Sequence, residues 1–199
     1  REIYKSLNLV SEFIFNQVTE CSESVWIAQK QGRAKDGIDI TDPSVLKMIH
    51  LFSRKDMNIG NCLNKLKVIP VAISYEYDPN DLIKAREVFA STNNTAYKKA
   101  DGEDLKSIAD GISKNKGNVC LNIGKEIRFD SESYEECADI ITKKINELYK
   151  NHLTNHAAIN LLTNRNYISQ KHQKAVEYLN TQMSHIPDEM HDTYSQKHP

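Results

Sequence analysis

The residues that most clearly suggest chemistry lie in one glycine-containing stretch, residues 29–37. The stretch reads QKQGRAKDG and places Gly32, Arg33 and Lys35 close together. A glycine lets the backbone approach a ligand closely, and an arginine can form paired, charge-assisted hydrogen bonds to a phosphate or carboxylate. The pattern therefore predicts an anion-binding loop. A solvated surface loop with ordinary charges is the alternative that these residues alone leave open.

A short apolar run directly precedes this loop and would have to position it. Residues 25–28 read VWIA, and an apolar, β-branched and aromatic run that is closed by glycines is typical of a buried strand. Ligands of α/β sheets bind beyond the carboxyl ends of such strands. We therefore expect residues 25–28 to form a strand that presents the loop.

Periodicity and capping signals predict the other elements. Residues 2–20 have the apolar spacing of an amphipathic helix packed on a sheet, and Asp42 with Pro43 marks the start of a second helix. Residues 56–64 favour a loop, with a helical turn at its end as the alternative. Residues 68–74 favour a strand in which Pro70 occupies a position that needs no ladder hydrogen bond. Further helices are expected within 81–112, broken at 91–95 and at Gly102, and after residue 131, while alternation predicts a half-buried strand at 119–123.

Bulk composition restricts the class of protein. The 199 residues carry 26 basic and 27 acidic side chains, a net charge of -1, which argues against a nucleic-acid binder driven by overall charge. No apolar run is long enough to cross a bilayer. The four scattered cysteines form no CxxC pair, so free thiols in a reducing compartment are expected, with Cys120 and Cys137 as packing residues. We expect one domain at 1–150 and a helical extension at 151–199 with a flexible tail after Ile186.

Three stretches, in order, resemble the glycerol-phosphate acyltransferase family. Residues 31–37, QGRAKDG, are similar to the family's motif Glu-Gly-(Gly or Thr)-Arg-Ser-(Arg or Lys)-x-Gly. Here Gln31 replaces the Glu, Ala34 replaces the Ser, and one small residue is missing before Arg33. Residues 67–76, KVIPVAISYE, resemble the motif apolar-Ile-Pro-Val-x-Ile-x-Tyr. Residues 117–125, GNVCLNIGK, resemble a late strand that ends in glycine.

The resemblance implies a fold and an activity. The fold would be α/β, a mixed sheet flanked by helices, with the helical extension at the C-terminus. Family members transfer a fatty acyl group from acyl-coenzyme A or acyl carrier protein to glycerol 3-phosphate or a lysophosphatidate in phospholipid synthesis. They need no cofactor. The implied location is cytoplasmic, peripheral to the inner face of a membrane, with a membrane surface as partner and no nucleic acid.

The resemblance also implies which residues bind substrate. Arg33, with Gly32 and Lys35, would hold the acceptor phosphate, and Gln31 would stand beside them. Pro70 would shape the wall of the site, and Tyr75 with Glu76 would leave the same strand end as further site residues.

The family's catalytic motif, His-x4-Asp, is missing from this chain. None of the seven histidines has an aspartate five positions later. In that motif the histidine is the general base for the acceptor hydroxyl, and the aspartate orients it. Since the chain has no initiator Met, we expect it to be the C-terminal portion of a longer enzyme whose dyad precedes Arg1, and to be inactive alone. A non-catalytic phosphate- or lipid-headgroup-binding module is the alternative. A helical interaction protein explains fewer of the patterns.

Overall fold

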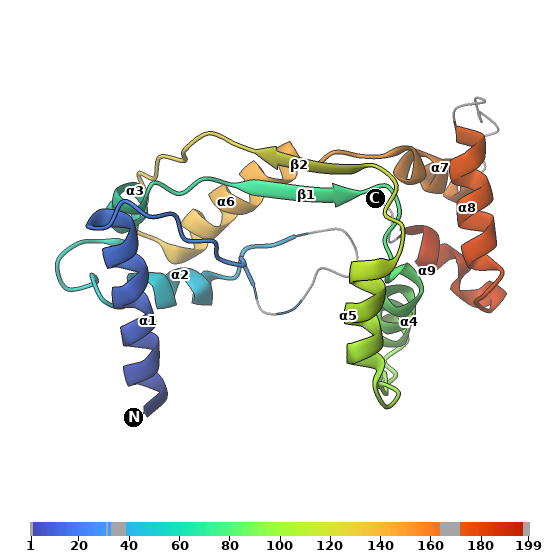
Figure 1. The fold of residues 1–199 in the computed structure, drawn as a ribbon, viewed down its shortest axis with the longest axis horizontal. Helices are drawn as coiled ribbons and strands as arrows, with labels where there is room; N and C mark the ends of the chain where they lie inside the picture. The colour runs from blue at the N-terminus through green and yellow to red at the C-terminus, as the bar shows by residue number, and fades with distance from the viewer. Residues whose placement is uncertain (1, 31, 33–38, 164–171, 197–199) are drawn as a thin grey trace. The chain divides into compact units, whose positions relative to one another are not determined.

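The computed structural model describes residues 2–30, 32, 39–163 and 172–196. These residues are mostly helical and include one sheet of two strands, β1 and β2 (Figure 1). The coarse expectation of a chain that combines helices and strands is therefore met. In chain order the elements are α1 (Glu2–Thr19), α2 (Pro43–His50), α3 (Ile59–Leu66), β1 (Val71–Tyr75), α4 (Asp81–Thr92), α5 (Glu103–Ser113), β2 (Val119–Ile123), α6 (Tyr134–Leu148), α7 (Leu153–Leu162), α8 (Gln173–Met183), η2 (Asp188–Met190) and α9 (His191–Gln196).

The chain folds into two compact units. The first contains the described residues of 1–33, 39–72 and 122–148, and the second contains those of 73–121 and 149–199. Residues 151–199 were predicted as a helical extension, and those that the structure describes lie in the same unit as 73–121. The boundary between the units falls within both strands.

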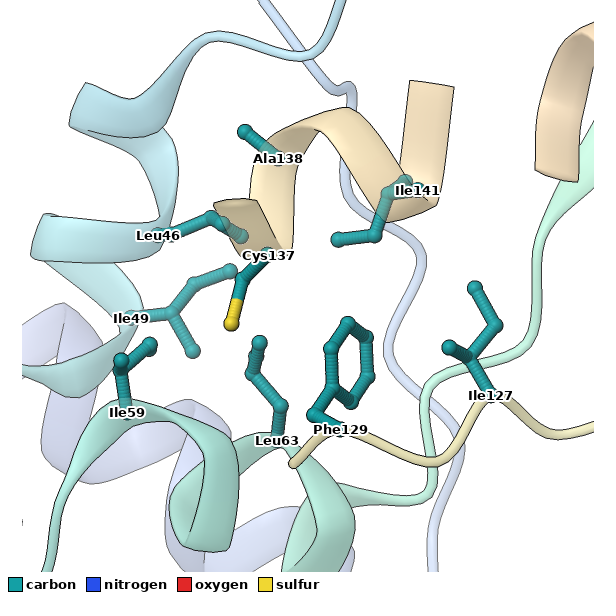
Figure 2. Close-up of a cluster of buried hydrophobic side chains, with 9 residues drawn as sticks. All are labelled: Leu46, Ile49, Ile59, Leu63, Ile127, Phe129, Cys137, Ala138 and Ile141. Carbon is teal, nitrogen blue, oxygen red and sulfur yellow. The ribbon is translucent and has the colours of Figure 1, made fainter. Parts of the chain in front are cut away.

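Three helices and the segment after β2 enclose the core of the first unit. Figure 2 shows their apolar side chains converging, with Phe129 among them. Helix α2 contributes Leu46 and Ile49, and α6 contributes Cys137, which is fully buried as predicted for a packing residue. The cluster comprises Leu46, Ile49, Ile59, Leu63, Ile127, Phe129, Cys137, Ala138 and Ile141.

Helix α1 forms as predicted but packs against helices and not against a sheet. Its contacts are with α2 and α3, and the buried Ser11 hydroxyl donates to the carbonyl of Ile49 at 2.6 Å. Ile3, Leu7 and Val10, which were expected to face the sheet, are exposed. The buried residues of α1 are Ser11, Ile14 and Phe15. The helix was therefore predicted correctly, but most of its packed face was not.

Helix starts follow their capping residues. The Asp42 carboxylate accepts the Ser44 N–H at 2.8 Å at the start of α2, and this bond lowers the pKa of Asp42. Asn58 caps α3 in the same way by accepting from Asn61. Residues 56–64 were predicted as a loop with at most a helical turn at its end. Helix α3 instead begins at Ile59, because the cap at Asn58 was not recognised.

The two strands are antiparallel, and their large apolar residues face outward. The N–H of Glu76 donates to Asn118 and that of Gly124 donates to Pro70, so odd-numbered residues of both strands share one face. In the second unit this face carries four residues that are 40–55% exposed: Ile73, Tyr75, Val119 and Leu121. The strand at 119–123 is confirmed. Its apolar side chains were expected to be the buried ones, but Asn122 turns inward and donates to the carbonyl of Leu148.

Residues 25–28 do not form the predicted strand. They are extended coil, and Trp26 is 70% exposed. In the described part of the chain the sheet has only β1 and β2, so the backbone of this run has no ladder partner. A run of four apolar residues cannot specify such a partner by itself.

The core of the second unit includes the C-terminal segment. Ile186, Met190 and Tyr194 are buried with residues of α4, α7 and α8. The tail after Ile186 was predicted to be flexible, but η2 and α9 form there because these apolar residues recur at four-residue steps. Among the residues described, no helix has both the length and the apolar character that crossing a bilayer requires.

Candidate functional site

The segments on either side of residues 31–38 are joined at their base. The Gln29 carbonyl accepts the N–H of Asp42 at 2.9 Å, and the Gln29 side-chain oxygen accepts the Thr41 hydroxyl at 2.8 Å. Beyond them, the Lys30 ammonium and the Asp39 carboxylate form an ion pair at 3.4 Å. The stretch that carries the predicted anion site therefore leaves and re-enters the fold at one place.

This base is fixed to helix α6. Thr41 is 2% exposed, and its N–H donates to the Thr142 hydroxyl at 2.9 Å. Thr142 in turn donates to the carbonyl of Ala138 one turn earlier. A buried N–H that is satisfied by a helix side chain gives the base one defined position. Thr41, and with it Gln29, is thus attached to helix α6 of the first unit.

Gly32 is the one predicted loop residue within the described part of the chain. It is exposed and has φ +81°, with no atom within 4 Å of the position that a Cβ would occupy. A positive φ is the conformation that favours glycine, and the space leaves backbone accessible to a ligand. Gln31, Arg33 and Lys35, the other predicted phosphate-binding residues of this loop, lie outside the described residues.

Pro70 is brought against the glycine of the third predicted motif. Pro70 is buried and directly precedes β1, and its carbonyl accepts the N–H of Gly124 at 2.9 Å. A Cβ on Gly124 would lie 2.8 Å from Pro70 Cγ and 2.9 Å from Leu148 Cδ1. Two segments more than 50 residues apart in the sequence thus meet at a contact that only glycine permits. As predicted, Pro70 sits where its missing N–H costs no ladder bond.

Tyr75 and Glu76 lie at the other end of β1, in the second unit. Tyr75 is 40% exposed. The Glu76 carboxylate accepts two hydrogen bonds from Asn118, from the N–H at 2.9 Å and from the side-chain amide at 2.6 Å. Glu76 therefore holds the turn before β2, a structural role that was not anticipated. Gly32 belongs to the first unit, so the structure describes the predicted site residues in two separate units.

The second unit contains a polar cleft that sequence reasoning missed. Its volume is about 410 Å³. Its cations, Arg86, Lys106 and Lys114, are balanced by three aspartates that already have partners. Asp81, for example, accepts the hydroxyls of Tyr178 at 2.8 Å and Tyr194 at 2.7 Å. The cleft thus has no excess of either charge. Its lining residues are brought together only by tertiary contacts, so no local sequence pattern predicts the cleft.

A buried serine–histidine pair also lies in the second unit. His152 Nε2 is 3.1 Å from the Ser74 hydroxyl, and both residues are at most 5% exposed. Burial lowers the pKa of His152, which favours the neutral imidazole. Neither residue lines the polar cleft. Because His152 also begins helix α7, where its N–H donates to Asn155, the pair is best explained as structural.

In the described ranges, no three His, Cys, Asp or Glu side chains are grouped as a metal site requires. The chain matches no family model, no curated protein and no solved structure.

Proposed function

We propose that this chain is the acceptor-binding portion of a glycerolipid O-acyltransferase. In this proposal Arg33, with Gly32, Gln31 and Lys35, binds the phosphate of glycerol 3-phosphate or of a lysophosphatidate. The acyl group comes from acyl-coenzyme A or acyl carrier protein. The chain acts at the inner face of a membrane, in phospholipid synthesis.

The observation that carries the proposal is the contact between Pro70 and Gly124. These residues belong to two different stretches that resemble the family's motifs. Each stretch was compared with its motif separately, so the two resemblances did not imply a contact between Pro70 and Gly124. Their fit is close enough that a side chain on Gly124 would collide with the proline ring. Two independently recognised motifs that form one packed unit support the resemblance more strongly than either stretch alone.

The base of the Gly32 loop gives further support. Phosphate binding by a loop requires that its backbone and cations be held in place. The contacts among Gln29, Thr41, Asp42 and Thr142 fix the residues on either side of 31–38, which supports this part of the proposal. Lys30 is engaged by Asp39, which leaves phosphate recognition in this proposal to Arg33 and Lys35.

A mixed sheet flanked by helices is part of the same proposal. In the first unit, Trp26, Ile69 and Ile123 are between 52% and 70% exposed. Large apolar side chains beside a two-stranded sheet are what additional strands and a covering helix would bury. The exposed run at residues 25–28 is also compatible with a strand once a neighbouring strand is available to pair with it.

The proposed reaction needs a general base that these 199 residues do not supply as His-x4-Asp. The test therefore uses the complete protein encoded by the gene, supplied with acyl-coenzyme A and glycerol 3-phosphate, and follows the release of free thiol. Thiol release that depends on the acceptor supports the proposal. Arg33→Ala should raise the Michaelis constant for the acceptor roughly tenfold or more, the scale of a lost charge-assisted bond.

Arg128→Ala is the matched control, because Arg128 is an exposed arginine that pairs only locally with Glu126. It should leave the kinetics unchanged. If Arg33→Ala also leaves them unchanged, the assignment of the phosphate site is wrong.

A non-catalytic headgroup-binding module is the second candidate, favoured by the missing dyad. It predicts that glycerol 3-phosphate binds, that Arg33→Ala weakens this binding in calorimetry, and that no acceptor releases thiol from either donor.

A further inference from the structure

The polar cleft of the second unit has the size of a small-molecule site. Its volume is about 410 Å³, within the range of pockets that bind small ligands. Its lining comes from α4 and the turn before it, from α5 and the residues after it, and from α8. All of these lining residues belong to the second unit. The cleft is therefore formed by contacts within one folded unit.

The carboxylates of the cleft are already held by groups of the protein. Asp78 accepts a hydrogen bond from the Lys84 ammonium at 2.8 Å, and Asp110 forms an ion pair with Lys114 at 3.0 Å. Asp81 accepts the two tyrosine hydroxyls described above. A cationic ligand would have to displace one of these partners, because no carboxylate among the lining residues lacks one.

Several hydrogen-bond donors of the cleft are unused. The side chains of Arg86, Lys106 and Gln182 line it and form no hydrogen bond or ion pair with the residues that the structure describes. A guanidinium and an ammonium can only donate, and the amide of Gln182 donates through its nitrogen and accepts through its oxygen. Donors thus outnumber acceptors among these groups, so a ligand of the cleft must be rich in acceptors.

One acceptor beside the cleft lacks a donor. Asn80 is a lining residue, and its side-chain oxygen is buried without a hydrogen-bond partner in the described ranges. The amide nitrogen of Asn80 donates to the Ser107 carbonyl at 3.2 Å. Since a carbonyl can only accept, this bond fixes which end of the amide is the oxygen. An unpaired buried acceptor costs free energy, and a small donor that enters the cleft beside Asn80 would remove this cost.

These groups together indicate a ligand with hydroxyl groups. A hydroxyl can accept two hydrogen bonds and donate one, which suits many free donors and few free acceptors. A carboxylate would only accept, and it would bring a charge that the balanced cleft does not offset. An ammonium would only donate.

We propose that the cleft binds a neutral polyhydroxylated molecule, a sugar or a sugar alcohol. Two adjacent hydroxyls accept from the fork of the Arg86 guanidinium, whose fixed geometry suits paired acceptors. Gln182 and Lys106 donate to others. This inference goes beyond the proposed acyl transfer, because the ligand carries no phosphate and its binding is measured without acyl donor or acceptor.

The experiment titrates the full, isotope-labelled chain with D-glucose, myo-inositol and sorbitol separately and follows amide shifts by NMR. Each is added to about 100 mM, well above the millimolar Kd expected for so small a neutral ligand. At least one should cause saturable shifts in the segments that line the cleft, residues 78–86, 106–115 and 178–182.

Arg86→Met keeps an aliphatic stem but removes the guanidinium, and it should raise the Kd at least about fivefold. Arg128→Met is the matched control, because Arg128 lies in the first unit and pairs only locally with Glu126. It should bind as wild type does. The same spectra show whether each variant is folded.

Three results would overturn the proposal. The first is the absence of saturable shifts at the cleft with all three polyols. The second is an equal Kd for Arg86→Met and wild type. The third is saturable shifts at the cleft with sodium acetate or glycine but with none of the polyols, which would assign the cleft to a charged ligand instead.

Discussion

At the scale of single residues, Gly124 is a position where no side chain fits without a shift of its neighbours. A Cβ on Gly124 would lie against the Pro70 ring and the Leu148 side chain, and the Pro70 carbonyl accepts the Gly124 N–H. Backbone and proline cannot give way as the end of a flexible side chain can. This contact links two of the three stretches on which the proposed family resemblance depends.

Gly124→Ala should lower the free energy of unfolding by about 1–3 kcal/mol, the usual cost of forcing a methyl group into a filled site. Urea denaturation measures it. Gly111→Ala is the control, because a Cβ there would meet only the flexible Asn80 side chain at 3.5 Å, and alanine is the better helix former. Equal stability of the Gly124 variant and wild type would show that Pro70 and Gly124 do not pack as described.

At the scale of elements, the base of the Gly32 loop depends on one side chain of α6. Thr142→Val keeps the shape of the side chain but leaves the buried N–H of Thr41 without its acceptor. We expect a loss of about 1–3 kcal/mol in the free energy of unfolding. Thr181→Val, at an exposed threonine that bonds only within α8, should cost much less. Comparable losses for both variants would contradict a specific role of Thr142.

His152, at the start of α7, should make the free energy of unfolding depend on pH. Burial lowers the pKa of His152 below its ordinary value of 6.5, so the unfolded state binds a proton more tightly than the folded state. The contribution of the buried, neutral His152 to the free energy of unfolding is therefore complete above pH 6.5. It decreases as the pH falls through 6.5 toward the lower pKa of the folded state.

His152→Asn, which cannot be protonated, should reduce the decline in the free energy of unfolding between about pH 6.5 and pH 5. Denaturation experiments across this range give the free energy of unfolding of wild type and of the variant at each pH. The other histidines are common to both proteins, so the difference between the two curves reports His152. An unchanged slope in the variant would mean that His152 titrates alike in both states.

At the scale of the whole molecule, the chain has two separate cores. Leu63 is 1% exposed in the first and Leu179 is fully buried in the second. Leu63→Ala and Leu179→Ala should each cost about 2–5 kcal/mol. In native-state hydrogen exchange, each should reduce amide protection mainly in its own unit. A uniform loss of protection from either variant would show that both cores unfold together.

The sequence predicted those features that local chemistry determines. Asp42 with Pro43 identified the start of α2, and Gly102 marked the break between α4 and α5. Pro70 was correctly expected where no ladder hydrogen bond is needed, and it directly precedes β1. These positions are set by capping and by backbone conformation, which act over a few residues.

The errors concern tertiary partners. The run at residues 25–28 has the composition of a strand but no strand to pair with among the described residues. Helix α1 packs against helices instead of a sheet, and most of its apolar stripe is exposed. The prediction of which face of β2 is buried was wrong, because the Asn122 side chain turns inward and donates to the partly buried carbonyl of Leu148. At the candidate site, Gly32 and Pro70 were identified from motifs. The supporting Thr142, more than 100 residues from the loop, was not, because no local pattern relates it to Thr41.

The most direct test of the central proposal is thiol release from acyl-coenzyme A by the complete gene product. The account predicts release that requires glycerol 3-phosphate or a lysophosphatidate, that weakens with Arg33→Ala and that survives Arg128→Ala. No release with glycerol 3-phosphate, dihydroxyacetone phosphate or a lysophosphatidate, from either acyl-coenzyme A or acyl carrier protein, would contradict it.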